Sequence, residues 1–425
     1  MLIFVIAFAI LLIIGVPISI SIGASAVLGC LSLDYPLMVI GQKMVTGVDS
    51  FLLIAVPLFI LAGNLMNAGK ITDKIFNTAK EMVGWIPGGL AHANVVASII
   101  FAGMSGSAVA DAGGLGTIEM QAMTSNGYDK EFAGAVTAAS SVIGPIFPPS
   151  IPLIIYGSVA SVSVGQLFMG GIVPGLLLGV ALMIMIGFYA VKRKYERVPF
   201  NLKRLAKEFY SSILALITPL IILAGFTTGW FTPTEASSIA VVYSLLVSVF
   251  VYKTMDWASF KKCLLDSAIS SANTLFIIGT STLFSYIMIK EGLSRQIADV
   301  ILGISSNPAV ILFVINIVLL ILGMVMEPGA ILTLMLPVLL PIVKGLNLDL
   351  VHFGVVMVLN LMIGQVTPPF GVCLFVTADV GGISLEKISK SILPFLIPLV
   401  AVLMICTYVP GFVTALPYAM MGTGA

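Results

Sequence analysis

Long runs of apolar residues alternate along the chain with short polar loops, and the runs have the length of membrane-spanning helices. About 20 consecutive apolar residues cross a hydrocarbon core of about 30 Å as an α-helix. By this measure the pattern predicts spans at roughly 2–33, 50–66, 168–191, 209–228, 235–252, 266–289 and 391–409. The first is long enough for one tilted span, which puts the N-terminus in the cytoplasm, or for two short spans, which put it outside.

Two further apolar regions, 88–166 and 308–379, are interrupted by Gly, Pro and Ser. A short amphipathic segment precedes each of them, near 70–83 and near 290–303. In the first, lysines and acidic residues gather on one side of the expected helix. A helix of this kind lies in the membrane interface more readily than it spans the bilayer.

The composition agrees with a membrane protein and excludes several other classes. The 425 residues are 59% hydrophobic and only 9% charged, whereas soluble domains carry about 25% charged residues. A net charge of +1 does not favour binding to nucleic acid. Two histidines and four scattered cysteines, without CxxC or HExxH, provide neither a zinc site nor a disulfide scaffold. We therefore expect an all-α polytopic membrane protein that is not an enzyme.

The positive charges assign the two sides of the membrane. A dense cluster follows the span at 168–191: Lys192, Arg193, Lys194, Arg197, Lys203, Arg204 and Lys207. The positive-inside rule places this cluster in the cytoplasm. If 88–125 and 308–343 are re-entrant helical hairpins, all but four of the 20 basic residues become cytoplasmic. The first hairpin then opens to the cytoplasm and the second to the outside.

The two interrupted regions are copies of one another at a constant offset of 220 residues. The matching pairs are Gly103-Met104 with Gly323-Met324, Asp129 with Asp349, Gly134 with Gly354, Gly144 with Gly364, Pro148-Pro149 with Pro368-Pro369, and Pro174 with Pro394. Inverted repeats of this kind are typical of secondary transporters, in which one bundle moves against another around a site near the midplane.

The repeat also predicts the domain organisation. We expect scaffold helices and a first interfacial arm helix at 1–87, followed by the first half of a transport domain at 88–166. Scaffold helices, linker helices and a second arm helix occupy 167–307. The second half of the transport domain occupies 308–379, and a C-terminal scaffold helix and tail occupy 380–425.

Four places break the expected helices near mid-membrane, and they predict two cation sites. Proline lacks the N–H that the helix ladder needs, so the adjacent prolines free carbonyl groups that must face protein, water or an ion. Carbonyl and hydroxyl oxygens suit sodium, and the half-helix ends supply partial charges. We expect one sodium site at Ser105, Ser107, Val142, Gly144 and Pro145, and a second at Gly323, Met326, Gly364 and Thr367. The alternative is that these breaks are kinks that allow close helix packing.

Substrate contacts are expected beside the same breaks. Glu327 is an ionisable residue at the second hairpin tip, where a charge is costly and function is the default interpretation. It either hydrogen-bonds substrate hydroxyls or amides, or caps the half-helix that starts at Pro328. The other expected contacts are Ser107, Ser150, Pro149 and Pro369.

At these motifs the sequence resembles the large membrane subunit of tripartite ATP-independent periplasmic (TRAP) transporters. The resemblance covers nearly the whole chain and is clearest in GMSGSAVAD at 103–111, GPIFPPS at 144–150, GMVMEPGA at 323–330 and GQVTPPFG at 364–371. Among members it looks closest to the sialic-acid branch. The family often has Asp-Pro-Thr at the second tip, where this chain has Glu327-Pro328-Gly329, so an acid stays in place but a hydroxyl is absent.

The resemblance implies an elevator fold, in which the hairpin domain carries substrate across a fixed scaffold in the bacterial inner membrane. It also implies coupling to two or more sodium ions, a small four-helix membrane subunit as a separate chain, and a periplasmic substrate-binding protein. The substrate would be an acidic sugar such as sialic acid (N-acetylneuraminate).

Alternatives to a sodium-driven importer of an acidic sugar concern the energy source, the substrate and the class of protein. The nearest ATP-binding string, from Gly63 to Lys70, has one residue too many and continues with Ile71, so a gradient rather than ATP is the expected energy source. The same scaffold could import C4-dicarboxylates or another organic acid. A passive channel would not need two mirrored closed tips. The remote alternative is an intramembrane enzyme that uses Asp111 and Glu327 as an acid pair.

Overall fold

The computed structural model describes residues 2–195, 197, 199–227, 229–305 and 307–422, and all regular elements in these ranges are helices. The expected all-α membrane fold is confirmed. Within the described residues, 8 helices are long and apolar enough to cross a membrane. They are α4 with the 3-10 turn η1 before it (Phe51–Ala68), α11 (Val164–Arg193), α12 (Leu202–Thr227), α13 with the π-helical turn η3 after it (Pro233–Val251), α14 (Trp257–Lys290), α16 (Pro308–Val325), α17 (Pro328–Gly345) and α20 (Leu385–Tyr408).

The segment 2–33 forms two short helices instead of one tilted span. These are α1 (Leu2–Ile13) and α2 (Ile18–Ser32), and they pack against each other. With 12 and 15 residues they reach only about 18 and 22 Å. Neither therefore crosses the hydrocarbon core alone. A third short helix, α3 (Met38–Val48), leads from them to η1 and α4.

The offset of 220 residues extends well beyond the sequence motifs, because equivalent helices recur at equivalent positions. The pairs are α5 (Ile71–Val83) with α15 (Leu293–Ile304), α6 (Gly89–Ser105) with α16, α9 (Lys130–Ser141) with α18 (Leu350–Gly364), α10 (Ile151–Ala160) with α19 (Val372–Gly381), and α11 with α20. The Pro148–Pro149 and Pro368–Pro369 peptide bonds are both cis. The inverted repeat thus covers most of the chain.

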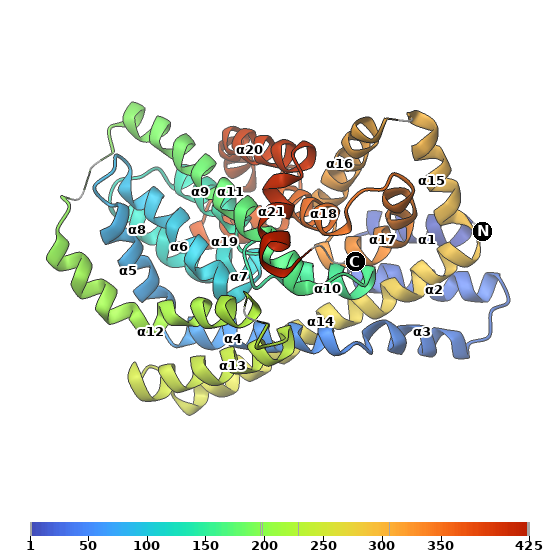
Figure 1. Cartoon of the computed structure of the whole chain (residues 1–425), viewed down its shortest axis with the longest axis horizontal. Helices are drawn as coiled ribbons and strands as arrows, with labels where there is room; N and C mark the ends of the chain where they lie inside the picture. Colours follow the sequence, from blue (N-terminus) through green and yellow to red (C-terminus); the bar gives the residue numbers. More distant parts are fainter. Residues whose placement is uncertain (1, 196, 198, 228, 306, 423–425) are drawn as a thin grey trace.

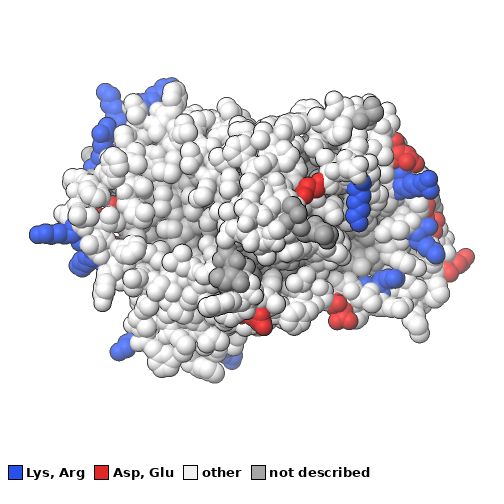
Figure 2. All heavy atoms as spheres, in the orientation of Figure 1, with Lys and Arg blue, Asp and Glu red and all other residues white. Residues whose placement is uncertain are grey.

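The two hairpins form as expected and point in opposite directions. The first runs from α6 through the short α7 (Ala108–Ala110) and the π-helical turn η2 (Asp111–Leu115) into α8 (Gly116–Ser125). The second consists of α16 and α17. In Figure 1, α6 and α8 lie towards the left end of the long axis, whereas α16 and α17 lie towards the right end. In Figure 2, Lys and Arg lie at both ends of the molecule; at the left end, which is the end of the first hairpin, few acidic residues accompany them, whereas at the right end they are mixed with Asp and Glu.

Helix packing groups the chain into two bodies. In the scaffold body, α14 packs on α2, α3 and α4, and α13 packs on α4 and α12. In the hairpin body, α9 packs on α6, α8 and α20, and α18 packs on α16, α10 and α11. The long helices α11 and α20, which the sequence analysis grouped with scaffold segments, pack among the hairpin helices. The C-terminal tail is also helical, as α21 (Gly411–Met421), and packs on α11.

The amphipathic segments form helices α5 and α15, and each one touches both bodies. Helix α5 packs on α6 of the hairpin body and on α12 of the scaffold body. Helix α15 packs on α17 and on α14 in the same way. These two helices therefore bridge scaffold and hairpins, in addition to direct contacts between the two bodies such as that of α14 with α17.

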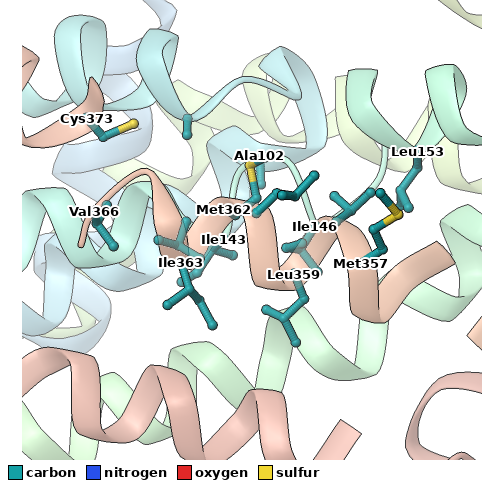
Figure 3. Close-up of a cluster of buried hydrophobic side chains, with 14 of the residues drawn as sticks. Ala102, Ile143, Ile146, Leu153, Met357, Leu359, Met362, Ile363, Val366 and Cys373 are labelled. Carbon is teal, nitrogen blue, oxygen red and sulfur yellow. The ribbon is translucent and has the colours of Figure 1, made fainter. Parts of the chain in front are cut away.

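A continuous apolar core joins the two broken helices. Figure 3 shows Ile143 and Ile146 from the first break beside Met362 and Ile363 of α18, and all four side chains are buried. The two breaks belong to one buried cluster. This packing positions the irregular backbone of both repeats.

Candidate functional site

The first hairpin tip lies against the first break. Helix α6 ends at Ser105, Gly106 adopts the left-handed conformation with φ of 59°, and the Ser107 hydroxyl accepts a hydrogen bond from the Ala110 N–H at 3.4 Å. A Cβ atom on Gly106 would lie 2.5 Å from the carbonyl oxygen of Pro149. Only glycine suits both this conformation and this close approach.

The first break leaves backbone carbonyl oxygens without hydrogen-bond partners in the described part of the chain. Helix α9 ends at Ser141 and α10 begins at Ile151. Within the described residues, no hydrogen bond reaches the carbonyls of Val142 and Gly144. A Cβ on Gly144 would lie 3.5 Å from the Ser107 carbonyl oxygen, so the tip and the break touch here as well.

Two serines of this region differ in their partners. The buried Ser105 hydroxyl has no hydrogen-bond partner in the part of the chain that the structure describes. By contrast, the Ser150 hydroxyl donates to the Pro145 carbonyl and accepts from the Leu153 N–H at 3.1 Å, so it caps α10. A free buried hydroxyl is available to a ligand, whereas a capping hydroxyl already has a structural role.

The second tip and second break make an even closer contact. A Cβ on Gly364 would lie 2.7 Å from backbone carbons of Gly323. The Gly371 N–H donates to the Met324 carbonyl at 3.1 Å, which bonds the second break to the second hairpin. The Thr367 hydroxyl donates to the Ile363 carbonyl at 2.7 Å and keeps lone pairs for a further partner. Met326 is buried between α16 and α17 in an extended conformation.

A buried polar clasp fixes each hairpin to its broken helix. In the first half, Ser140 donates to the Asn94 side chain at 2.6 Å. In the second half, the Asn360 side chain donates to the Asn316 side chain at 2.9 Å. Ser140 and Asn360 occupy equivalent repeat positions, 220 residues apart. The sequence analysis missed these clasps, because a single polar residue inside an apolar helix carries no spacing signal.

A cavity of about 390 Å³ lies where the tips, the breaks and the scaffold meet. Its lining comes from both hairpin tips, from the first break with α10, from α18, and from the scaffold helices α4 and α14. The lining residues are Ile60, Gly63, Asn64, Ser105, Gly106, Ser107, Ala108, Val109, Ala110, Pro145, Ile151, Pro152, Ile155, Ser270, Thr274, Glu327, Pro328, Gly329, Met362 and Gln365.

Glu327 is the only ionisable residue among these lining residues. It occupies the position before α17, and its carboxylate lies near the Gly329 backbone N–H without the geometry of a capping hydrogen bond. Its Oε2 atom is buried and has no partner among the described residues. An unsatisfied acceptor beside a cavity suits a hydroxyl or amide donor of a ligand.

The structure brings the predicted residues of each site together, but only some of them line the cavity. Ser105, Ser107, Pro145 and Glu327 line it. The remaining predicted residues are not part of its lining: Val142, Gly144, Pro149, Ser150, Gly323, Met326, Gly364, Thr367 and Pro369. Asp111 does not line it either, so the acid pair of the enzyme alternative does not meet there.

Four polar lining residues were missed: Asn64, Ser270, Thr274 and Gln365. Asn64 lies on α4, and Ser270 and Thr274 lie on α14, both of which are regular at these positions. No break or motif marks them, and the Asn64 side chain donates to Ser267 of α14 at 2.8 Å.

The comparisons with known proteins agree with this geometry. The family model described as "Tripartite ATP-independent periplasmic transporter, DctM component" matches residues 5–412. The chain belongs to this family. It is therefore the large membrane subunit of a TRAP transporter, a multi-pass protein of the bacterial inner membrane and a transporter rather than an enzyme.

Several relatives of this TRAP subunit are similar over most of its length. The sialic acid TRAP transporter large permease protein of Vibrio cholerae is 44% identical over 384 residues, which are 90% of each chain. The sialic acid TRAP transporter permease protein of Haemophilus influenzae is also 44% identical, over 88% of this chain but only 61% of its own length. The C4-dicarboxylate TRAP transporter large permease protein of Vibrio cholerae is 36% identical over 97% of this chain and 96% of its own.

One solved structure shares the fold. The Alcanivorax borkumensis YdaH transporter, reported to have an unusual topology, matches with a TM-score of 0.63 over 97% of this chain and 98% of its own. The sequences are only 13% identical, so this likeness concerns the fold alone.

Proposed function

We propose that this TRAP subunit imports an acidic sugar, of the sialic acid class, together with sodium ions by an elevator movement. The observation that carries the proposal is the cavity, which has one acid and no basic residue in its lining and lies between two contacts of hairpin tip and broken helix. The names of the two relatives that are 44% identical support the substrate class.

Charge balance argues for the sodium ions. A carboxylate that enters this cavity finds no Lys, Arg or His in the lining to neutralise it. Its counter-charge must then come from bound cations and from helix N-termini, such as that of α10, which begins at the cavity with Ile151 and Pro152. Ser105, Ser107, Val142, Gly144 and Pro145 would hold one sodium ion beside it.

The second sodium ion would lie at the equivalent position of the other repeat, held by Gly323, Met326, Gly364 and Thr367. If two sodium ions accompany one monocarboxylate, one net positive charge enters per cycle. That charge is worth about 2.3 kcal/mol per 100 mV, or roughly fifty-fold accumulation, before any sodium gradient.

The packing supports an elevator movement of one body against the other. Both tips and both breaks belong to the hairpin body, whereas the facing cavity wall belongs to α4 and α14. Helices α5 and α15 would guide the movement because each contacts both bodies. We place α11 and α20 in the moving body, since they pack among the hairpin helices.

TRAP transporters of this family work with a periplasmic binding protein and usually with a small membrane subunit. We propose that the small four-helix subunit is a separate chain here. In the Haemophilus influenzae relative, the matched part is 61% of a longer protein, so the additional segment of that relative is the natural model for such a partner.

Uptake into proteoliposomes tests the proposal. The chain is reconstituted with its small subunit, and N-acetylneuraminate is supplied on its binding protein. Accumulation is expected with an inward sodium gradient and is expected to disappear when K⁺ replaces Na⁺. Equal uptake in both salts would refute the sodium coupling.

A C4-dicarboxylate is the second candidate, because the 36% identical relative is named for it. A second carboxylate, however, would approach Glu327 without a basic residue nearby in the cavity lining. We therefore expect succinate to leave N-acetylneuraminate uptake unchanged. Complete inhibition by succinate would favour the second candidate.

A further inference from the structure

The segment that joins α11 to α12 carries a dense positive charge. Between positions 192 and 207 it contains seven Lys and Arg residues, all exposed; we call it the basic segment. Among the described residues only one of the seven, Arg193, pairs with a carboxylate, that of Asp129. The other six therefore keep their charge available to a partner outside the chain.

Apolar side chains project from the same part of the surface. Phe188 and Val191 are 69% and 66% exposed at the end of α11. Phe200 and Leu202 are 55% and 67% exposed at the start of α12. A surface that alternates cations with exposed apolar residues suits the boundary between phospholipid headgroups and acyl chains, where each type finds its own partner.

A shallow hollow lies at the base of the basic segment. It measures about 520 Å³ and is lined by Asn126, Gly127, Asp129, Arg193, Lys194 and Tyr195. Asp129 and the ring of Phe132, 5.0 Å from the guanidinium, hold Arg193 in place. The neighbouring Lys194 has no acidic partner among the described residues, so it is free to meet a phosphate there.

We propose that the basic segment binds anionic phospholipid headgroups of the cytoplasmic leaflet. Figure 2 shows basic residues at the end of the molecule where α11 and α12 are joined, and that end is cytoplasmic by the positive-inside rule. If the basic residues served only to orient the chain in the membrane, their charge would be needed, but the exposed apolar residues and the hollow would not. A soluble polyanion would not explain the apolar residues either.

The expected strength follows from the charge count. Each Lys or Arg close to an anionic membrane surface is worth about a five-fold preference. Removal of three charges should therefore weaken binding on the order of 100-fold. The lipid would also anchor the connection between the hairpin body and the scaffold body.

Native mass spectrometry of the full chain in detergent tests this, with phosphatidylglycerol or phosphatidylcholine as the added lipid. The wild type should bind phosphatidylglycerol on the order of 100-fold more tightly than phosphatidylcholine. The triple variant Lys203→Gln, Arg204→Gln, Lys207→Gln should lose this preference. The double variant Lys203→Arg, Lys207→Arg should keep it, which separates loss of charge from loss of folding.

The matched control removes three exposed charges at other places: Lys290→Gln, Arg295→Gln and Lys344→Gln. It should bind phosphatidylglycerol like the wild type. Equal binding of the two lipids, an equal loss in the control, or displacement of the lipid by inorganic phosphate at the same concentration would each overturn the proposal.

Discussion

The contact between Gly323 and Gly364 allows a sharp test of the proposed second cation site. In Gly364→Ala, the new Cβ would lie 2.7 Å from backbone carbons of Gly323, whereas ordinary contacts begin at 3.4 Å. No flexible side chain can move aside, so the hairpin and α18 must separate by about 0.7 Å. Forced overpacking of this kind costs about 1–3 kcal/mol.

The separation also displaces the oxygens that would hold the ion. Cages for hard cations keep their ligands within narrow limits, about 2.3–2.6 Å for calcium. The expected shift of about 0.7 Å is larger than the difference between these two limits, which is about 0.3 Å. We expect the sodium concentration for half-maximal uptake to rise at least ten-fold, which corresponds to about 1.4 kcal/mol of binding energy.

The repeat supplies a matched control at the equivalent position of the first half. In Gly144→Ala, the new Cβ would lie 3.4 Å from the Ser141 carbonyl oxygen and 3.5 Å from that of Ser107, which are ordinary contacts. Its sodium dependence should stay within about two-fold of the wild type. Uptake into proteoliposomes over a sodium titration measures both variants. An unchanged sodium dependence in Gly364→Ala, or an equal rise in both variants, would contradict the reasoning.

Three further predictions follow from single contacts. Gly106→Ala should abolish uptake while the protein still inserts, because the left-handed conformation costs roughly 1–2 kcal/mol and the Cβ meets the Pro149 carbonyl at 2.5 Å; wild-type uptake would refute it. Ser150→Ala should lower the free energy of unfolding by about 0.5–2 kcal/mol, because it removes the cap on α10. Ser105→Ala should leave the free energy of unfolding unchanged and weaken the sodium dependence of uptake, because the Ser105 hydroxyl has no partner among the described residues. Thermal unfolding measures the first effect and a sodium titration of uptake measures the second. Glu327→Gln should raise the KM for N-acetylneuraminate several-fold at unchanged sodium dependence; an unchanged KM would show that the free carboxylate oxygen does not face the substrate.

Much of the fold could be predicted because its signals are local. Runs of apolar residues mark the long helices, and the Pro-Pro pairs mark both breaks, since proline cannot continue a helix ladder. The length of the segment 2–33 could not distinguish one tilted span from two short helices. In the structure the break between α1 and α2 falls near Pro17. The grouping of α11 and α20 depends on tertiary contacts, which an unbroken apolar helix does not reveal.

The candidate site could be predicted only in part, because tertiary contacts that complete it leave no local signal in the sequence. The repeat marked Gly144 and Gly364 as equivalent positions. The structure shows why glycine is needed at 364, because a Cβ there would lie 2.7 Å from backbone carbons of Gly323. Asn64 and Thr274 escaped notice because they lie on regular scaffold helices, where one polar residue is indistinguishable from a packing residue. Ser150 matched the motif, but its hydroxyl bonds to Pro145 and Leu153 instead of facing the cavity.

The lining of the cavity bears on leakage as well as on uptake. Glu327 is the one ionisable residue in this lining, and no basic residue lines the cavity to neutralise an organic anion that arrives without cations. If the proposed sodium coupling holds, such a carrier has little tendency to slip, because stored substrate would leave down its own gradient only by taking sodium ions out against theirs. A single added lysine in this wall would be enough to loosen that restraint.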